Sequence, residues 1–237
     1  MFQVIYSPNW FYGKDIIIDF VAVIALALIS YFSMRYYRID KKNKNFVFLS
    51  VSFMLLSAAF LSKILTNFTI YYPVIFTKQI GLVTLTYHVF HETNTLFIVG
   101  FLLYRLLYLL GLYILYTLYQ EEKKMGESLL IIYLIAVSTY FSREAYFIFH
   151  ITSLILLALI CYRYSYHYKN RPTAFGRSLL SAFIVITISH LLSVFIGIDL
   201  FFYAIAEIVQ LVGYGLLIWT FIKVLMHGKT KPTRHHR

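Results

Sequence analysis

The sequence predicts an all-α membrane protein: a bundle of seven transmembrane helices with the N-terminus outside and the C-terminus in the cytoplasm. Composition, long apolar segments and the distribution of positive charge lead to this prediction. Of the 237 residues, 60% are hydrophobic and only 13% are charged, whereas soluble domains have about 25% charged residues. The mean hydropathy of +0.74 agrees. An ordinary soluble domain is therefore excluded.

Seven apolar segments approach the length that a membrane span requires. A hydrocarbon core about 30 Å thick needs about 20 apolar residues per helix. The predicted spans are, in order, Ile16–Met34, Phe46–Leu61 with fraying past Lys63, Asn94–Leu118, Ser128–Phe141, Ala145–Tyr162, Ser178–Ile198 and Leu200–Ile222. Residues 1–227 are expected to form a single transmembrane domain, and residues 228–237 a basic, disordered cytoplasmic tail.

The third span is ambiguous because residues 79–119 would form a helix about 60 Å long, too long for one ordinary crossing. We favour a span near Asn94–Leu118, with Gln79–Thr93 as an interfacial or re-entrant segment or an outward extension of the same helix. In the alternative, Ile80–Leu103 crosses the membrane and Leu106–Tyr119 forms a short in-plane helix.

The favoured span buries Arg105 near the middle of the membrane. A buried arginine requires a partner or a water-filled cavity. Glu207, a carboxylate well inside another predicted span, is its expected partner. Snorkelling, or capping of the guanidinium by tyrosine and backbone oxygens, is the alternative.

Positive charge predicts the orientation. Lysine and arginine in short loops favour the cytoplasmic side. With the N-terminus outside, 16 of the 21 basic residues lie in inner segments and four in outer ones, and Arg105 is the remaining one. The net charge of +11 is thereby explained by membrane topology, and no nucleic-acid partner is predicted.

Polar and ionisable residues in the helices concentrate in the outer half of the bundle. Polar residues in lipid-embedded helices normally face the bundle interior. His88, His91 and Glu92 are spaced for one face if that segment is helical, and Glu207 and Gln210 share a face by the same rule. The predicted ligand-binding pocket consists of His88, His91, Glu92, His150, His190, Glu207 and Gln210.

Several chemistries fit such a pocket. Imidazoles can bind a metal ion, here through His150, His190 and His91. Alternatively, His150 and His190 could hold a b-type haem between two helices. A protonatable network could instead bind a polar ligand or respond to external pH. In the simplest alternative, the histidines only join helices by hydrogen bonds.

These observations predict a multi-pass protein of the cell membrane with a sensor- or receptor-like binding function. The ligand would be a small molecule, a metal ion or a proton, and a signal would pass to a cytoplasmic or membrane partner through the basic inner loops. The alternatives are a small structural subunit of a larger membrane assembly and a haem- or metal-dependent intramembrane redox protein or enzyme. No catalytic residues are predicted, and the single cysteine excludes a disulfide framework.

Overall fold

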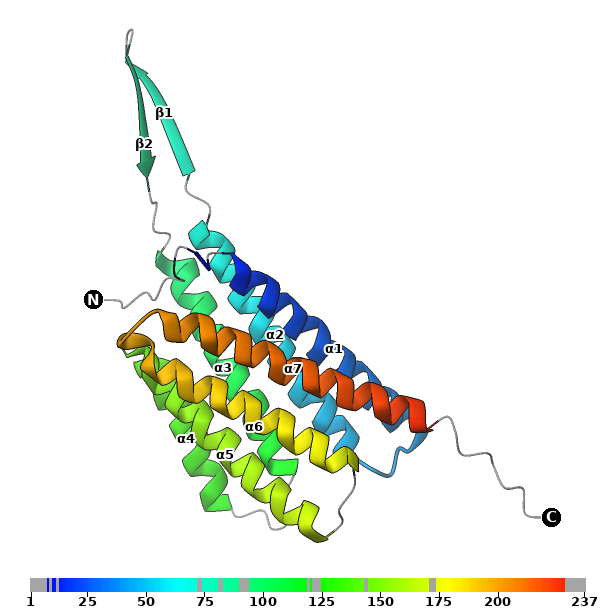
Figure 1. Cartoon of the computed structure of the whole chain (residues 1–237). Helices are drawn as coiled ribbons and strands as arrows, with labels where there is room; N and C mark the ends of the chain where they lie inside the picture. Colours follow the sequence, from blue (N-terminus) through cyan, green and yellow to red (C-terminus); the bar gives the residue numbers. More distant parts are fainter. Residues whose placement is uncertain are drawn as a thin grey trace, which may run out of the picture.

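The computed structural model describes residues 8, 10–11, 13–71, 74–80, 83–89, 94–118, 120, 125–142, 145–170 and 174–228. Within these residues the chain forms seven α-helices, one short 3-10 helix and one antiparallel hairpin (Figure 1). In chain order the elements are α1 (Lys14–Ile39), α2 (Asn45–Tyr71), β1 (Val74–Ile80), β2 (Val83–Val89), α3 (Asn94–Leu118), α4 (Met125–Phe141), α5 (Tyr146–Asn170), α6 (Ala174–Val194), η1 (Phe195–Gly197) and α7 (Phe201–Gly228).

Six of these helices, α1, α2, α3, α5, α6 and α7, are long and apolar enough to cross a membrane. The shortest of their candidate spans has 21 residues, which gives about 31 Å at the helical rise per residue. Helix α4 has 17 residues and is shorter than a usual span. The composition and length of the helices thus identify a multi-pass helical membrane protein.

The two faces of α1 show the reverse of the pattern expected in water. Asp15 and Asp19 are fully buried, whereas Ile17, Phe20 and Ile24 are 66%, 56% and 43% exposed. A helix in an apolar solvent turns its polar residues toward its neighbours, because lipid cannot satisfy them. The side-chain distribution therefore agrees with lipid around the bundle.

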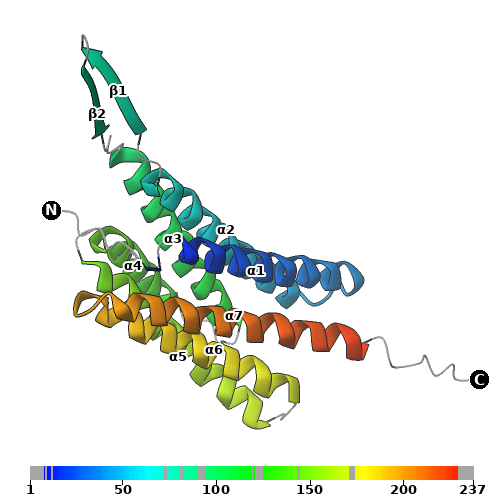
Figure 2. The same cartoon turned by 45° about the horizontal axis from the view of Figure 1, so that its top comes forward.

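Successive helices run in alternating directions between the two ends of the bundle (Figure 1). Helix α2 packs against α1 and α3, α6 packs against α5 and α7, and α1 packs against α7, while α4 contacts α3 and α5. The hairpin extends away from the helices where α2 ends and α3 begins, as both views show (Figures 1 and 2). We call this end, where α1 and α7 also begin, the hairpin end.

Small residues bring α2 and α3 close together. The Ser52 hydroxyl donates to the Gly111 carbonyl at 2.7 Å, and the Ser62 hydroxyl donates to the Gly100 carbonyl at 3.1 Å. A Cβ atom on Gly111 would lie 2.8 Å from Leu56 Cγ and 3.1 Å from the Ser52 carbonyl oxygen. Glycine and serine thus allow the close backbone contact that is typical of helix pairs in membranes.

A cluster of aromatic rings occupies the centre of the bundle. Its members come from α2, α3, α5 and α7 and are Phe60, Tyr104, Tyr108, Phe149 and Tyr214. Their neighbouring ring centroids lie 5.3 to 6.1 Å apart, mostly in tilted or edge-to-face geometry. These contacts fix the positions of the polar groups that lie beside the rings.

The favoured limits of the third span are confirmed, since α3 covers Asn94–Leu118. The alternative in which Gln79–Thr93 extends the helix outward is wrong where the chain is described, while the interfacial or re-entrant alternative stays a prediction. Val83–Val89 is a strand that pairs with Val74–Ile80, and residues 90–93 lie outside the described residues. The helical spacing assumed for His88 therefore does not apply, because a segment rich in β-branched residues favours a strand.

Helix α2 corrects a second expectation. It continues past Lys63 to Tyr71 instead of fraying, because the lysine has acidic partners inside the bundle. Helices α5 and α7 also extend beyond the predicted apolar segments, to Asn170 and Gly228. The predicted tail beyond Gly228 lies outside the described residues.

Candidate functional site

A lysine and two carboxylates from three helices meet in the bundle interior. The Nζ atom of Lys63 on α2 lies 2.9 Å from Asp19 Oδ1 on α1 and 2.7 Å from Glu207 Oε1 on α7. The three side chains are 8%, 0% and 8% exposed, respectively. We call Asp19, Lys63 and Glu207 the charged triad.

A second polar contact joins α1 to α7 one helical turn closer to the hairpin end. The Tyr203 hydroxyl donates to Asp15 Oδ2 at 3.1 Å. Asp15 precedes Asp19 by four residues and Tyr203 precedes Glu207 by four, so each pair shares a helix face. Because α1 and α7 both begin at the hairpin end, the Asp15–Tyr203 contact and the charged triad lie one above the other along the two helices. Asp19 and Glu207 lie about 8 to 9 Å along α1 and α7 from that end.

The triad contains two acidic groups and one basic group. With all three groups ionised, two carboxylates face one ammonium, and the net charge is −1. Asp19 Oδ2 and Glu207 Oε2 are buried, and neither has a hydrogen-bond partner among the described residues. Removing a charged group from water costs several kcal/mol unless its remaining lone pairs are satisfied. Two acceptor atoms in the interior are thus open to a donor.

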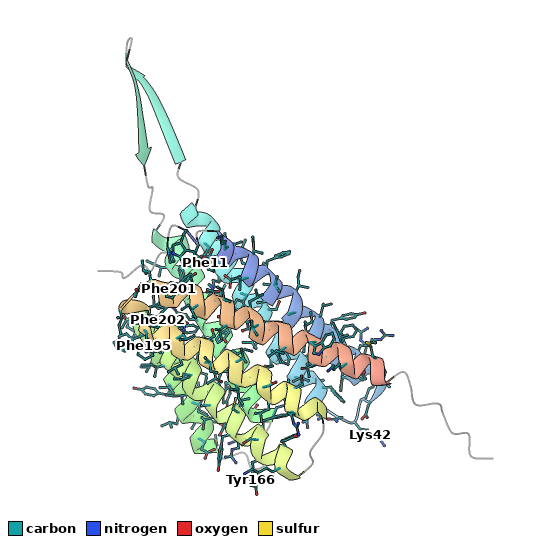
Figure 3. All side chains as sticks on the ribbon, in the orientation of Figure 1. Phe11, Lys42, Tyr166, Phe195, Phe201 and Phe202 are labelled. Carbon is teal, nitrogen blue, oxygen red and sulfur yellow. The ribbon has the colours of Figure 1, made fainter. Side chains whose placement is uncertain are left out.

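A buried, mainly apolar cluster lies beside the Asp15–Tyr203 contact at the hairpin end. This group, the apolar plug, consists of Phe11, Ile18, Ile196, Tyr203 and Ala204, all buried. Phe11 and Tyr203 pack edge to face with their centroids 6.4 Å apart. Figure 3 shows Phe11, Phe195, Phe201 and Phe202 at this end of the bundle. The plug thus packs the first turns of α1 and α7 together at the hairpin end.

A second polar cluster lies beside the aromatic rings. His150 Nδ1 and His190 Nδ1 are 3.2 Å apart, and His190 Nε2 lies 2.7 Å from the Tyr108 hydroxyl. The Tyr108 hydroxyl also forms a hydrogen bond with Tyr214. We call these four residues, from α3, α5, α6 and α7, the His–Tyr chain. All of them are buried, and His150 Nε2 at the end of the chain has no partner among the described residues.

Arg105 lies near this chain. It is 7% exposed, with its guanidinium carbon 5.6 Å from the Phe101 ring centroid and 5.8 Å from that of Tyr146. Its Nε atom has no hydrogen-bond partner among the described residues. Glu207, the partner expected from the sequence, is bonded to Lys63, so the expected pairing is not found.

The other predicted pocket residues are not all brought together. Gln210 on α7 accepts a hydrogen bond at 3.5 Å from Ser189, the residue before His190. His88 lies in β2, paired with Ile75 of β1 and outside the helical bundle. His91 and Glu92 lie outside the described residues. The bundle therefore places His150 and His190 together, and Glu207 with Lys63.

The histidine pair does not have the geometry of a bis-histidine haem site. Iron–nitrogen bonds of about 2 Å on both faces would separate the two ligating nitrogens by roughly 4 Å, with the macrocycle between them. Here the two Nδ1 atoms contact each other directly at 3.2 Å, and Tyr146 packs 4.6 Å from the His150 ring. In the part of the chain that the structure describes, no three His, Cys, Asp or Glu side chains are grouped to hold a metal ion.

Sequence reasoning missed Lys63, Asp15 and Asp19 as interior residues. The sequence places Lys63 at the fraying end of the second predicted span, and Asp15 before and Asp19 inside the first one, with no role assigned to either aspartate. Two signals could have identified them. Asp15 and Asp19 are one helical turn apart, so they share a face, and Lys63 stands within an otherwise apolar segment.

No protein family, curated protein or solved structure matches this chain.

Proposed function

We propose that this multi-pass membrane protein is a binding module, and that its charged triad binds a small ligand through a positively charged ammonium group. The ligand would lie against Asp19 and Glu207, in place of a pocket built mainly of histidines. Signal transmission to a cytoplasmic partner through the basic inner loops remains part of the proposal.

The unpartnered carboxylate oxygens carry this proposal. Asp19 Oδ2 and Glu207 Oε2 are both buried and open, and an ammonium group is a triple hydrogen-bond donor. Lys63 neutralises one of the two negative charges, so a single additional positive charge would balance the site. A ligand ammonium would therefore supply hydrogen-bond donors to these oxygens and balance the charge of the ionised triad.

A purely structural role is the competing function. Polar residues also join helices in membranes, and a subunit of a larger assembly needs no ligand. Such a role requires only the bonds from Lys63 to Asp19 and Glu207. In a purely structural role, the second oxygen of each carboxylate has no hydrogen-bond partner among the described residues, whereas a bound ammonium group would donate to both oxygens.

The proposed topology has seven crossings, with α4 as the shortest at about 25 Å, the N-terminus outside and the C-terminus inside. The distribution of charge supports it. Arg35, Arg38, Lys41, Lys42 and Lys44 follow one another at the end of α1 and in the loop before α2, and Lys42 lies at the end opposite the hairpin (Figure 3). This end would face the cytoplasm, because basic loops are retained there, and the membrane would be the cell membrane.

The binding proposal is tested by titrating methylammonium into the protein in lipid nanodiscs at constant ionic strength, using calorimetry. Wild-type protein is expected to bind it saturably. Glu207→Gln removes one charge-assisted contact and is expected to weaken binding about tenfold or more. The matched control is Glu127→Gln, because Glu127 is exposed at the start of α4. Equal affinity in wild-type and Glu207→Gln protein would contradict the proposed site.

A further inference from the structure

The His–Tyr chain has two possible hydrogen-bond directions, and its chemistry favours one of them. A phenol is a stronger acid than the N–H of a neutral imidazole, so the Tyr108 hydroxyl is the favoured donor to His190 Nε2. The Tyr108 oxygen then accepts from Tyr214. His190, with Nε2 accepting, carries its proton on Nδ1 and donates it to His150 Nδ1 across 3.2 Å.

This direction of the hydrogen bonds determines whether His150 Nε2 carries a proton. Because a neutral histidine has one N–H, and His150 Nδ1 accepts from His190, the proton of His150 stands on Nε2. His150 Nε2 has no partner among the described residues. The chain therefore ends in a buried N–H donor that lacks an acceptor.

Arg105 supplies a second open donor nearby. Its guanidinium carbon lies 5.8 Å from the centroid of the Tyr146 ring, and the same ring lies 4.6 Å from that of His150. The Nε–H of Arg105 is buried without a partner in the described part of the chain. No described carboxylate lies within salt-bridge distance of this guanidinium. Two buried donors, one of them charged, thus lie near the same tyrosine ring.

The geometry points to an anion-binding site formed by Arg105 and His150 beside Tyr146, with a small carboxylate as its ligand. Guanidinium is the cation best suited to a carboxylate, since its N–H groups match the carboxylate oxygens. His150 Nε2–H adds a directional neutral donor. The site is separate from the charged triad and does not depend on ammonium binding there.

The neighbouring charged groups are compatible with an anion. Lys63 interacts electrostatically with His150 and His190, and Arg105 with His150. Asp19 and Glu207 also interact electrostatically with Tyr146, but Lys63 contacts both carboxylates and partly neutralises them. Lys63 and Arg105 therefore both favour a negative charge near His150.

The first test uses wild-type protein and needs no ligand. Nitrogen-15 NMR of histidine-labelled protein in lipid nanodiscs distinguishes the two tautomers. His150 is expected to carry its proton on Nε2 and His190 on Nδ1, with His150→Gln and His190→Gln used to assign the signals. A proton on His150 Nδ1 would reverse the chain, remove the second donor and overturn the proposal.

The second test is a titration with sodium acetate against sodium chloride at equal ionic strength, measured by calorimetry and by the His150 Nε2 signal. Acetate is expected to bind and to shift that signal. Arg105→Gln is expected to lose about tenfold or more of the acetate affinity, the effect of one charge-assisted hydrogen bond. Arg105→Lys keeps the charge without the planar donor group and is expected to bind acetate with intermediate affinity.

Arg35→Gln is the matched control, because Arg35 is an exposed arginine near the other end of α1. It is expected to leave acetate binding unchanged. Acetate that binds the Arg105→Gln and wild-type proteins equally, or that fails to move the His150 signal, overturns the anion site. Because the probe differs from methylammonium, loss of either binding activity is distinguished from loss of the other.

Discussion

Lys63 and Glu207 are 144 positions apart in the chain, and their side chains lie 2.7 Å apart in the bundle. The same faces of α2 and α7 also meet through Phe60 and Tyr214, at a ring distance of 5.3 Å. Glu207 and Tyr214 are separated by seven residues and therefore lie two turns apart on one face. The ion pair and the aromatic contact therefore belong to one interface between α2 and α7.

Replacement of Lys63 by methionine is expected to destabilise the protein by about 3 to 5 kcal/mol, because it leaves Asp19 and Glu207 buried without their shared cation. The thermal unfolding midpoint of the protein in detergent measures this effect. Lys44→Met, at an exposed lysine before α2, is the matched control and should unfold as wild type does. Equal midpoints for the two variants would show that the triad is not essential for stability.

The triple variant Asp19→Asn, Lys63→Met, Glu207→Gln removes all three charges together. It is expected to be more stable than Lys63→Met alone, because no buried charge remains uncompensated. Unfolding midpoints of the triple and single variants under the same conditions give the comparison. A triple variant that is less stable than Lys63→Met would mean that these residues contribute mainly through packing or neutral hydrogen bonds.

Substitution of Gly111 by alanine is expected to destabilise the α2–α3 contact by about 1 to 3 kcal/mol through overpacking. The added Cβ would lie 2.8 Å from Leu56 Cγ and 3.1 Å from the Ser52 carbonyl oxygen. Gly215 on α7 is the control, since a Cβ there has no atom within 4 Å. Thermal unfolding should separate the two variants, and the prediction fails if Gly111→Ala is as well tolerated as Gly215→Ala.

Removal of the Tyr108 hydroxyl by substitution with phenylalanine is expected to cost about 1 to 3 kcal/mol, because His190 Nε2 loses its buried partner. The same change should allow His190 to change tautomer, which nitrogen-15 NMR would detect. Tyr133 on α4 is 68% exposed, so Tyr133→Phe should change neither stability nor the histidine signals. Unaltered His190 signals in Tyr108→Phe protein would rule out this hydrogen bond.

The proposed orientation predicts which engineered cysteines react from outside the cell. In a Cys161→Ser background, Asp199→Cys in the α6–α7 turn is expected to react with a membrane-impermeant maleimide in intact cells. Lys42→Cys in the α1–α2 loop should react only after permeabilisation. Both positions are exposed, so accessibility of the side chain itself is matched. The reverse labelling pattern would mean that the bundle has the opposite orientation.

The helical segments could be predicted from the sequence because apolar length follows directly from the thickness of a bilayer. The limits of α3 were found even though Arg105 lies inside it, since an isolated charge does not end a helix. The interior position of Lys63 was not predicted, because its partners come from helices that are distant in the sequence and no local pattern reveals them. The hairpin was also missed, although four of the seven residues in each of the segments VIFTKQI and VTLTYHV are β-branched, as is typical of strands.

The arrangement of His150 and His190 could also be predicted from the sequence only in part. His150 and His190 could be placed at a common depth from their distances to the helix ends. Their direct contact depends on the rotation of α5 and α6 about their axes, which packing of Tyr108 and Phe149 determines. Rotation of this kind is weakly encoded in helices whose lipid-facing and interior sides are both apolar.

The carbon-13 signal of the Glu207 side-chain carboxylate, followed by NMR during a methylammonium titration in lipid nanodiscs, tests the proposed binding site most directly. Glu207→Gln assigns the signal, and methanol serves as an uncharged probe of similar size. The Glu207 signal should shift saturably with methylammonium and remain unchanged with methanol. A Glu207 signal that moves no more than that of the exposed Glu127 would contradict ligand binding at the charged triad.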